Sequence, residues 1–322
     1  MDGIIIVDKE KGYTSFDCVA KLRGILKTRK IGHTGTLDPD ATGVLPVCVG
    51  RATKVCDVLT DRDKTYEATV VLGITTDTLD TTGEVLSRKP VNVTRDGLLA
   101  VLSHFKGEIT QVPPMYSAVK VNGKRLYEYA REGKEVSRKE RRVTVYGIEL
   151  LEENLFPMEP QTISVFSALP FFRIRVKCSK GTYIRTLCDD IGRELGCGAA
   201  MSSLIRTEVG RFRLEDALRL DEIEEKMKDY DPATNDEQLS FLIPVDEILN
   251  YPRLKVLPEG MQLLANGNPL SEKQVRYDEG GAFSLTDGKR FRIYSPDNEF
   301  YALYKWSGNK HRYVVEKYFH GS

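Results

Sequence analysis

One stretch rich in glycine, proline and threonine constrains the fold of this chain more than any other part of it. It reads Gly32-His33-Thr34-Gly35-Thr36-Leu37-Asp38-Pro39-Asp40-Ala41-Thr42-Gly43-Val44-Leu45-Pro46. Glycine opens backbone angles that are closed to other residues, and Pro39 restricts the preceding Asp38 to an extended conformation. Because apolar segments flank the stretch, the sequence predicts a rigid loop between two core elements, with the Asp38 carboxylate at its centre. An ordinary Asp-Pro turn is the plain alternative.

Length and composition bound the class of protein. The chain has 322 residues, which is long for one hydrophobic core and suggests two domains. No apolar run approaches the ~18 residues that a membrane helix needs. Residues 1–7 are acidic where a signal peptide is basic, so we expect a buried strand there and a cytoplasmic protein. The six cysteines show no C-x-x-C pair, which favours reduced, mostly buried thiols and no metal site.

Hydrophobic periodicity indicates both strands and helices. Residues 66–72 and 172–178 alternate between apolar and polar side chains, as half-buried strands do, and the second carries a basic stripe on its polar side. Apolar spacing predicts a helix capped by Thr14 or Ser15, with Phe16 among its apolar positions. It predicts another that Gly181-Thr182 cap, with Tyr183 and Leu195 on its apolar face. Short β-like runs beyond Pro252, at residues 283–285, 291–294, 300–304 and 313–315, suggest a small all-β domain of about 70 residues. The fold class is therefore α+β.

The charge distribution indicates an RNA partner, although the net charge of zero argues against one. Residues 120–142 hold nine Lys/Arg against four Glu, and residues 214–239 compensate with ten acids against three bases. A basic face is thus possible on a neutral protein. Tyr127 and Tyr129 lie among the bases of the first segment, and aromatics for stacking beside bases for phosphate suit loop RNA. For the bases alone, a solvated charged helix is the alternative.

Several blocks together resemble the TruB family of tRNA pseudouridine synthases. The loop of residues 32–46 resembles the family signature, and further blocks match in the same order. They are Val7-Asp8-Lys9 with Gly12, Lys64-Thr65-Tyr66, Asp77-Thr78 with Asp80, Pro113-Pro114-Met115-Tyr116-Ser117-Ala118, Gly123-Lys124 with Leu126-Tyr127-Glu128-Tyr129-Ala130-Arg131, and Cys178-Ser179-Lys180-Gly181-Thr182-Tyr183-Ile184-Arg185. These blocks span roughly the first two thirds of the chain.

The resemblance implies a fold, a domain division and a reaction. The expected fold is a pseudouridine-synthase core with a central, largely antiparallel sheet flanked by helices, plus a small C-terminal all-β, PUA-like domain. The core would span residues 1–248, with an RNA-clamping insertion at about 108–146, and the PUA-like domain residues 249–322. The family reaction converts a uridine of the tRNA T stem-loop, at position 55, to pseudouridine without a cofactor. A monomer that needs no protein partner and binds no membrane is expected.

The resemblance also assigns roles to side chains. Asp38 would act beside the sugar and base as nucleophile or cation stabiliser, and Arg185 would keep it ionised and oriented. Tyr66 would stack on the flipped base and help remove the proton lost late in the reaction. The residues expected to contact the RNA are His33, which helps hold the base out, Asp80, which binds its polar edge, and Lys9, Tyr183, Leu204, Lys124, Arg125, Arg131, Arg141 and Arg142. The point of attack by Asp38, at C1′ or C6 or by assisting glycal formation, stays open.

Three other functions remain compatible with parts of this pattern. A non-catalytic RNA-binding protein or tRNA chaperone would explain the basic segments but not the glycine-locked Asp38. A glycosidase-like hydrolase would use Asp38 with a second carboxylate and release free uracil. A relative that works within a guide-RNA particle would share the fold, but the complete insertion and modest length favour a stand-alone enzyme.

Overall fold

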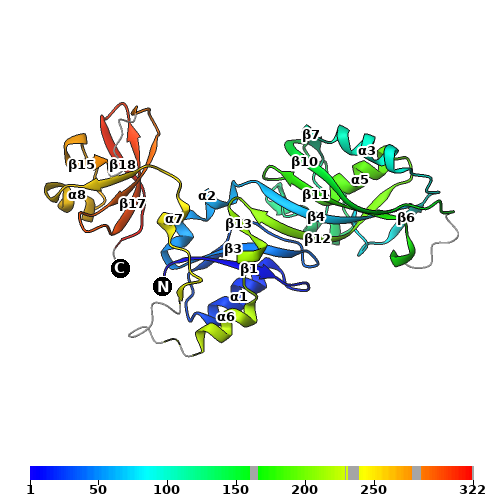
Figure 1. Cartoon of the computed structure of the whole chain (residues 1–322), viewed down its shortest axis with the longest axis horizontal. Helices are drawn as coiled ribbons and strands as arrows, with labels where there is room; N and C mark the ends of the chain where they lie inside the picture. Colours follow the sequence, from blue (N-terminus) through cyan, green and yellow to red (C-terminus); the bar gives the residue numbers. More distant parts are fainter. Residues whose placement is uncertain (160–165, 229, 231–238, 278–283, 321–322) are drawn as a thin grey trace.

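The computed structural model describes most of the chain, namely residues 1–159, 166–228, 230, 239–277 and 284–320. It confirms the α+β class, because a large part built on one mixed sheet is followed by a smaller β domain at one end of an elongated molecule (Figure 1). Within these residues, no helix combines the length and apolar character needed to cross a membrane. The predicted acidic surface loop near residues 229–236 lies, apart from Tyr230, outside the described residues.

The central sheet carries the site. Its nine strands follow the order β1-β3-β12-β4-β11-β10-β7, with β2 beside β3 and β13 beside β12. All neighbours pair antiparallel except β3 and β12, which are parallel, so the expectation of a largely antiparallel sheet is confirmed. The strands are β1 Gly3–Lys9, β2 Ile31–His33, β3 Thr42–Val49, β4 Lys64–Leu72, β7 Gly107–Gln111, β10 Arg141–Asn154, β11 Phe171–Cys178, β12 Ala199–Val209 and β13 Phe212–Arg213.

Helices cover one face of both halves of this sheet, and a smaller group lies on the other face of β1 and β3. α3 (Arg95–His104) and α5 (Ile184–Glu194) pack against β4, β11 and β12. α1 (Ser15–Ile25) and α6 (Leu220–Met227) pack against β1 and β3. The short α2 (Cys56–Thr60) and α7 (Val245–Ile248) join an apolar cluster on the opposite face of β1 and β3. Strand β1 is therefore buried on both faces, which explains why its sequence is continuously apolar instead of alternating.

The predicted N-cap is present in α1 but not in α5. Thr14 caps α1 in a reciprocal capping box with Asp17, as the sequence predicted. Thr182 does not cap α5, because its hydroxyl donates to the Ser179 carbonyl, and Tyr183 is the N-cap residue instead of part of the apolar helical face. Tyr183 therefore lies at the N-terminus of α5.

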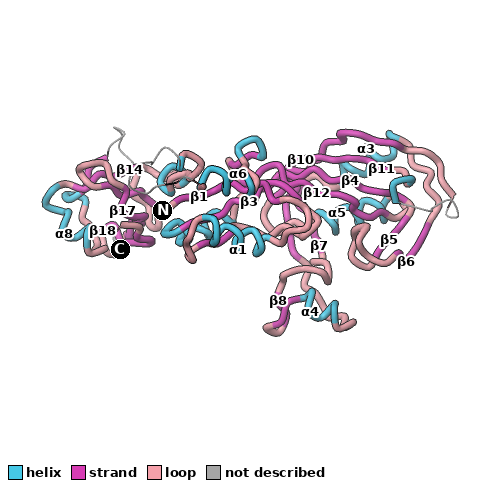
Figure 2. Tube along the Cα trace, turned by 90° about the horizontal axis from the view of Figure 1, so that it is seen from below, coloured by secondary structure: helices cyan, strands magenta, loops and turns pink. Residues whose placement is uncertain are grey.

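The insertion leaves the sheet after β7 and returns with β10. The segment outside the sheet therefore spans residues 112–140, within the expected 108–146, because both ends of that range belong to core strands. It carries the hairpin of β8 (Lys120–Val121) and β9 (Lys124–Arg125) and the helix α4 (Leu126–Arg131). Figure 2 shows this segment projecting from the body of the molecule as an arm. A separate hairpin, β5 (Ile74–Thr76) with β6 (Val85–Arg88), frames the loop that holds Asp80.

The C-terminal domain is a five-stranded sheet in the order β15-β14-β16-β17-β18 with its own apolar core. Its elements are β14 Arg253–Val256, α8 Met261–Ala265, β15 Val275–Tyr277, β16 Arg290–Tyr294, β17 Phe300–Ser307 and β18 Arg312–Tyr318. The small C-terminal all-β domain is thus confirmed. Of the predicted runs, the one at 283–285 is not a strand at Ser284 and Leu285, and Phe283 lies outside the described residues.

Candidate active site

The loop between β2 and β3 is fixed on every side. Leu37 N–H donates to the Ser15 hydroxyl at 2.9 Å, and Gly12 N–H donates to the Pro39 carbonyl at 2.9 Å. Thr34 N–H donates to the Pro46 carbonyl at 3.1 Å, so the two ends of the loop are joined. Buried backbone groups that find such partners stabilise one conformation. The prediction of a rigid loop around Asp38 is confirmed.

The side chain of Lys9 contacts the backbone beneath this loop and is not available to bind RNA. Its side chain is completely buried, and its ammonium donates to the carbonyls of Pro39 at 3.1 Å and Glu10 at 3.0 Å. Burial lowers the pKa of Lys9, which fits a cation removed from water. The predicted RNA contact of Lys9 is therefore corrected to a structural contact beneath the Asp38 loop.

Arg206 is the second buried cation under the loop, and no local sequence pattern indicates its role. Its side chain is 1% exposed, and its guanidinium donates to three carbonyls: Val44 at 2.8 Å, Gly35 at 3.3 Å and Thr36 at 3.4 Å. It reaches them because β12 lies parallel to β3, with Arg206 opposite Gly43. Arg206 therefore holds the loop against strand β3.

Arg185 lies between two carboxylates. Its Nη2 is 2.9 Å from Asp38 Oδ2, and its Nη1 is 3.6 Å from Asp80 Oδ2. The same guanidinium donates to the carbonyls of Tyr116 at 2.8 Å and Thr78 at 3.1 Å, so four segments of the chain meet at one side chain. Arg185 is 7% exposed while Asp38 is 44% exposed. The carboxylate is thus held from one side and open to a ligand on the other.

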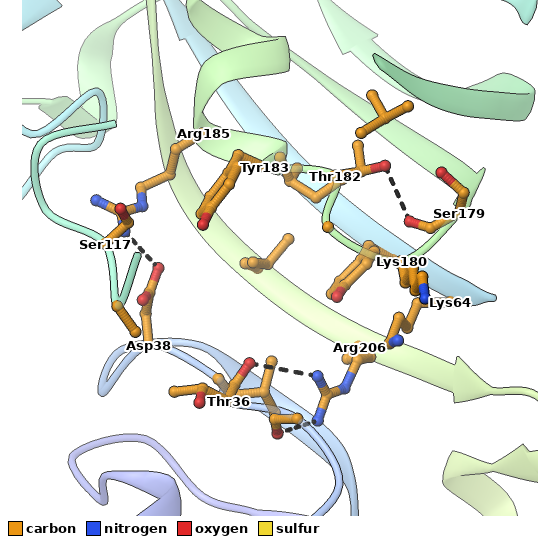
Figure 3. Close-up of a pocket in the computed structure, with 18 of the residues that line it drawn as sticks. Thr36, Asp38, Lys64, Ser117, Ser179, Lys180, Thr182, Tyr183, Arg185 and Arg206 are labelled. Carbon is orange, nitrogen blue, oxygen red and sulfur yellow. Dashed lines mark hydrogen bonds and ion pairs between the residues drawn. The ribbon is translucent and has the colours of Figure 1, made fainter. Parts of the chain in front are cut away.

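Two connected cavities meet at this ion pair, and residues such as Leu37, Ser117 and Leu204 line both of them. The smaller, of about 480 Å³, contains Tyr66, Tyr183, Arg141 and Arg142 in its walls. Figure 3 shows Tyr183 near the ion pair of Asp38 and Arg185. The larger, of about 750 Å³, contains His33, Asp80, Arg125 and Arg131. Together they form a groove with room for a nucleotide on either side of Asp38.

Tyr66 and Leu204 form part of the floor of the smaller cavity. Each is 8% exposed, because β4 and β12 place them side by side on the face that α5 covers. Burial raises the pKa of the Tyr66 phenol, so it keeps its proton at neutral pH. Tyr183 is fixed at its backbone, where its N–H donates to Gln111 Oε1 at 3.0 Å.

His33 and Asp80 both line the larger cavity. The Nδ1 atom of His33 accepts from Gly35 N–H at 3.3 Å, and burial, with the Arg206 charge, lowers the pKa of the imidazole. A neutral ring with Nδ1 accepting leaves Nε2–H as a donor. Asp80 Oδ1 already accepts from Thr78 and Thr82, so Oδ2, beside Arg185, is its remaining acceptor.

The basic residues of the insertion are arranged around two tyrosines. Arg125 and Arg131 lie over the ring of Tyr127, at 5.7 Å and 5.3 Å from its centroid, and all three line the larger cavity. Lys124 lies over Tyr129 at 4.9 Å and pairs with Glu132, but it lines neither cavity. The residues predicted from the sequence therefore all line at least one of the two cavities, with two exceptions. Lys9 lies below the loop, and Lys124 lies on the arm.

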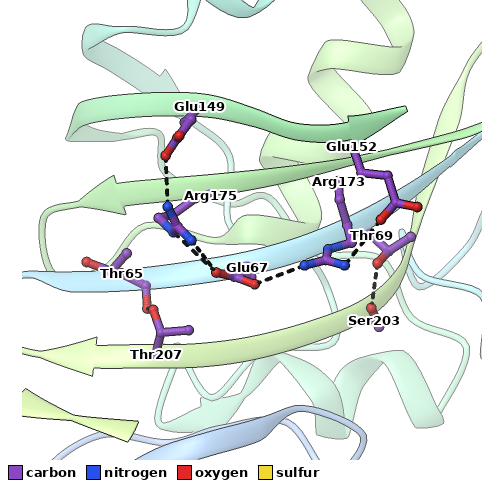
Figure 4. Close-up of polar contacts among 9 residues, drawn as sticks. All are labelled: Thr65, Glu67, Thr69, Glu149, Glu152, Arg173, Arg175, Ser203 and Thr207. Carbon is purple, nitrogen blue, oxygen red and sulfur yellow. Dashed lines mark hydrogen bonds and ion pairs between the residues drawn. The ribbon is translucent and has the colours of Figure 1, made fainter. Parts of the chain in front are cut away.

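The predicted basic stripe on β11 is not free for RNA. Arg173 and Arg175 both pair with Glu67 on β4, at 3.3 Å and 2.8 Å, and also with Glu152 and Glu149 on β10 (Figure 4). The acids come from neighbouring strands, so the alternation within β11 could not reveal them. The stripe is a neutral ladder of ion pairs on the open face of the sheet.

Comparison with known proteins identifies the family. The model described as "TruB family pseudouridylate synthase (N terminal domain)" matches residues 23–184, and the one described as "tRNA pseudouridylate synthase B C-terminal domain" matches residues 185–250. The chain belongs to the TruB family. A protein of Lachnoclostridium phytofermentans named tRNA pseudouridine synthase B is 51% identical over 320 residues, covering 99% of this chain and 100% of that protein. A protein of the same name from Bacillus cytotoxicus is 50% identical over 83% of each chain.

Solved structures extend the likeness of this TruB-family chain to its whole length. A chain in the structure of an H/ACA RNP bound to a substrate RNA containing 2′-deoxyuridine matches with a TM-score of 0.70 at 26% identity, over 99% of this chain and 85% of that one. A chain in a Cbf5-Nop10-Gar1 complex gives 0.68 at 28% identity, over 99% and 85%. The fold prediction is thus confirmed.

Sequence reasoning missed three residues of the groove besides Arg206. Lys64 lines the smaller cavity and is 8% exposed, although it matched a family block only as a neighbour of Tyr66. Phe16 was expected in the core of α1 but is 62% exposed and lines the larger cavity. Ser117 is 6% exposed and lines both. Among the described residues, no group of His, Cys, Asp and Glu is arranged to hold a metal ion.

Proposed function

We propose that this protein isomerises a uridine of tRNA to pseudouridine. The observation that carries the proposal is the ion pair of Asp38 and Arg185 at the junction of two cavities, in a chain that matches tRNA pseudouridine synthases over its full length. A half-exposed carboxylate held by a buried guanidinium is ionised, oriented and reachable. These are the properties that an essential acidic group beside a sugar and base requires.

The reaction breaks the C1′–N1 bond, turns the base and forms a C1′–C5 bond, so no group or electron enters or leaves overall. The Asp38 carboxylate acts on the sugar or the base, and Arg185 fixes its direction. Tyr66 stacks on the uracil; because its phenol stays protonated, we assign it stacking and hydrogen bonding in preference to the role of a free base. Asp80 Oδ2 accepts from the polar edge of the base.

The target uridine must leave its stack, because its reactive atoms are otherwise inaccessible. We propose that His33 and Phe16 lie against the RNA where the base has left, and that the arm of residues 112–140 grips the backbone. Unstacking costs on the order of a few kcal/mol, which the contacts of Arg125, Arg131, Arg141 and Arg142 must offset. Lys124 would reach RNA only from the arm.

The finer parts of the proposal concern the substrate and the assembly. The site is position 55 in the T loop, the division runs between a catalytic domain of residues 1–248 and a PUA-like domain of residues 249–322, and the enzyme is a cytoplasmic monomer that works without a protein partner. The names of the matched curated relatives support a tRNA substrate. Mapping pseudouridine in tRNA from cells with and without this gene tests the position.

The catalytic proposal is tested with Asp38→Asn. We expect tritium release from tRNA carrying 5-³H-uridine to fall by at least about 10³-fold, because the amide neither attacks nor stabilises a cation. Asp40→Asn is the matched control, since Asp40 lies on the same loop but pairs with exposed Lys11 at 3.6 Å, whereas Asp38 pairs with Arg185; its kcat should stay normal. Near-normal release by Asp38→Asn would remove the carboxylate from the mechanism.

The same assay separates the alternatives. A non-catalytic RNA-binding protein or tRNA chaperone would bind tRNA tightly and release no tritium with any variant. A glycosidase-like hydrolase would release free uracil, which chromatography detects. Either result with the wild-type protein would contradict the proposed isomerisation.

A further inference from the structure

The smaller cavity has a cationic end that the proposed chemistry does not use. Besides Arg185, its lining holds the bases Lys64, Arg141, Arg142, Lys180 and Arg206, against the single acid Asp38. Asp38 is already paired with Arg185. In Figure 3 this ion pair lies at one end of the cavity, whereas Lys64, Lys180 and Arg206 lie at the other.

Two of the cations at this end of the smaller cavity, Lys64 and Arg206, are buried and donate hydrogen bonds to neutral carbonyl groups. Lys64 donates to the carbonyls of Thr60 at 2.9 Å and Arg62 at 2.6 Å, and Arg206 donates to the carbonyls of Val44, Gly35 and Thr36. Among the described residues, neither of the two forms an ion pair with a carboxylate. Removing a charge from water is unfavourable unless an opposite charge or several hydrogen bonds offset the cost.

The rim bases are different. Lys180 pairs with Asp61 at 2.8 Å and Arg142 with Glu108 at 3.4 Å, both pairs being exposed to solvent. Exposed pairs exchange partners easily, because solvent and salt screen their attraction. The buried cations Lys64 and Arg206 therefore have no carboxylate partner among the described residues. The exposed bases Lys180 and Arg142 can donate further hydrogen bonds to an anion that binds there.

We propose that the end of the smaller cavity around Lys64 and Arg206 is a phosphate subsite, which takes a backbone phosphodiester group of the RNA next to the flipped uridine. This inference rests on the proposed function. A phosphodiester is the anion that accompanies every nucleotide, and it flanks the ribose that must lie at Asp38. The phosphate supplies the missing counter-charge, so binding energy from this end holds the sugar in place.

The charge state of Lys64 gives the subsite a signature. Burial and the neighbouring Arg206 lower the pKa of Lys64 to about 8. The other groups that face it are Cys178 on β11, whose pKa burial raises to about 11, and Asp61 and Asp63 in the preceding turn. Phosphate binds the protonated form, so affinity is full below pH 8 and is lost above it, by up to about tenfold between pH 7 and pH 9.

The experiment measures binding of the full-length protein to T stem-loop RNA by fluorescence anisotropy. The phosphates on either side of the target uridine are replaced, one at a time, by uncharged methylphosphonate. In wild type we expect one replacement to weaken binding about tenfold at pH 7 and to abolish the loss of affinity at pH 9. In Lys64→Met the unmodified RNA should bind about tenfold more weakly, and the same replacement should add nothing.

Lys177→Met is the matched control, because Lys177 lies on β11 beside Thr65 but is exposed and lines neither cavity. It should bind like wild type with each RNA. Equal losses from methylphosphonate in wild type and Lys64→Met, or no loss at either position, would overturn the phosphate subsite. If Lys64→Met does not fold, the pH dependence of wild type decides alone. Tritium release from unmodified RNA, measured in parallel, shows separately whether the isomerisation itself fails.

Discussion

At the scale of single residues, Arg185 is the group on which the site depends. Its planar guanidinium contacts Asp38, Asp80 and two carbonyls in different directions from one buried position. A first-turn arginine opposes the helix dipole, so Arg185 does not stabilise the helix by its charge. The structure shows the reason for it: the start of α5 points the side chain into the groove.

Arg185→Lys should preserve the charge and lose the geometry. An ammonium is a point charge that cannot reach all four oxygen partners, so Asp38 loses its fixed direction. We expect kcat to fall roughly 100-fold, as for other small misplacements of reacting groups, with tRNA affinity within about threefold of wild type. Single-turnover kinetics measure the first quantity. Arg193→Lys on the exposed side of α5 is the control, and full activity of Arg185→Lys would contradict the role given to the guanidinium.

At the scale of elements, the parallel contact of β3 with β12 determines where the catalytic loop lies. Gly43 sits in this contact with φ = +99°, and a Cβ atom there would lie 2.3 Å from the Arg206 carbonyl oxygen. A side chain would therefore separate the two strands and displace Arg206 from the carbonyls of the loop.

Gly43→Ala should reduce both stability and activity. Backbone strain and the clash together should lower the free energy of unfolding by about 2–4 kcal/mol, measured by chemical denaturation. Tritium release should fall further than the folded fraction does, because the loop moves. Gly147→Ala on β10 is the control, since no atom lies within 4 Å of its Cβ position, and should change stability by less than about 0.5 kcal/mol. Equal effects of the two variants would show that the close contact is unimportant.

The same contact shows what the sequence could and could not predict. Strands β4 and β11 were predictable, because alternation with period two is a local property of each segment. The pairing of Arg206 with a loop about 170 residues away depends on the order of strands, which no local pattern contains. For the same reason the acids that neutralise Arg173 and Arg175 stayed hidden until the neighbours of β11 were known. Asp38, Tyr66 and Arg185 were found only through the family motifs that contain them.

At the scale of the whole molecule, the β domain is docked onto the catalytic part by an apolar patch and a few polar bonds. Leu303 and Phe319 belong to one buried cluster with Val55 and Leu59 of the catalytic part. At the edge of this patch, Lys317 on β18 pairs with Asp57 at 2.7 Å. The β domain lies at one end of the molecule, and this junction holds it against the catalytic part (Figure 1).

The two kinds of contact at the junction should contribute unequally. Phe319 is 5% exposed, so Phe319→Ala should cost about 3 kcal/mol of docking energy, whereas Lys317→Met should cost about 1 kcal/mol or less because Asp57 is largely exposed. In calorimetry, Phe319→Ala should divide the unfolding of the protein into two transitions, and Lys317→Met should leave one. The opposite result would mean that charge pairing, and not apolar burial, joins the domains. Salt would then loosen the junction under the same conditions in which it weakens RNA binding.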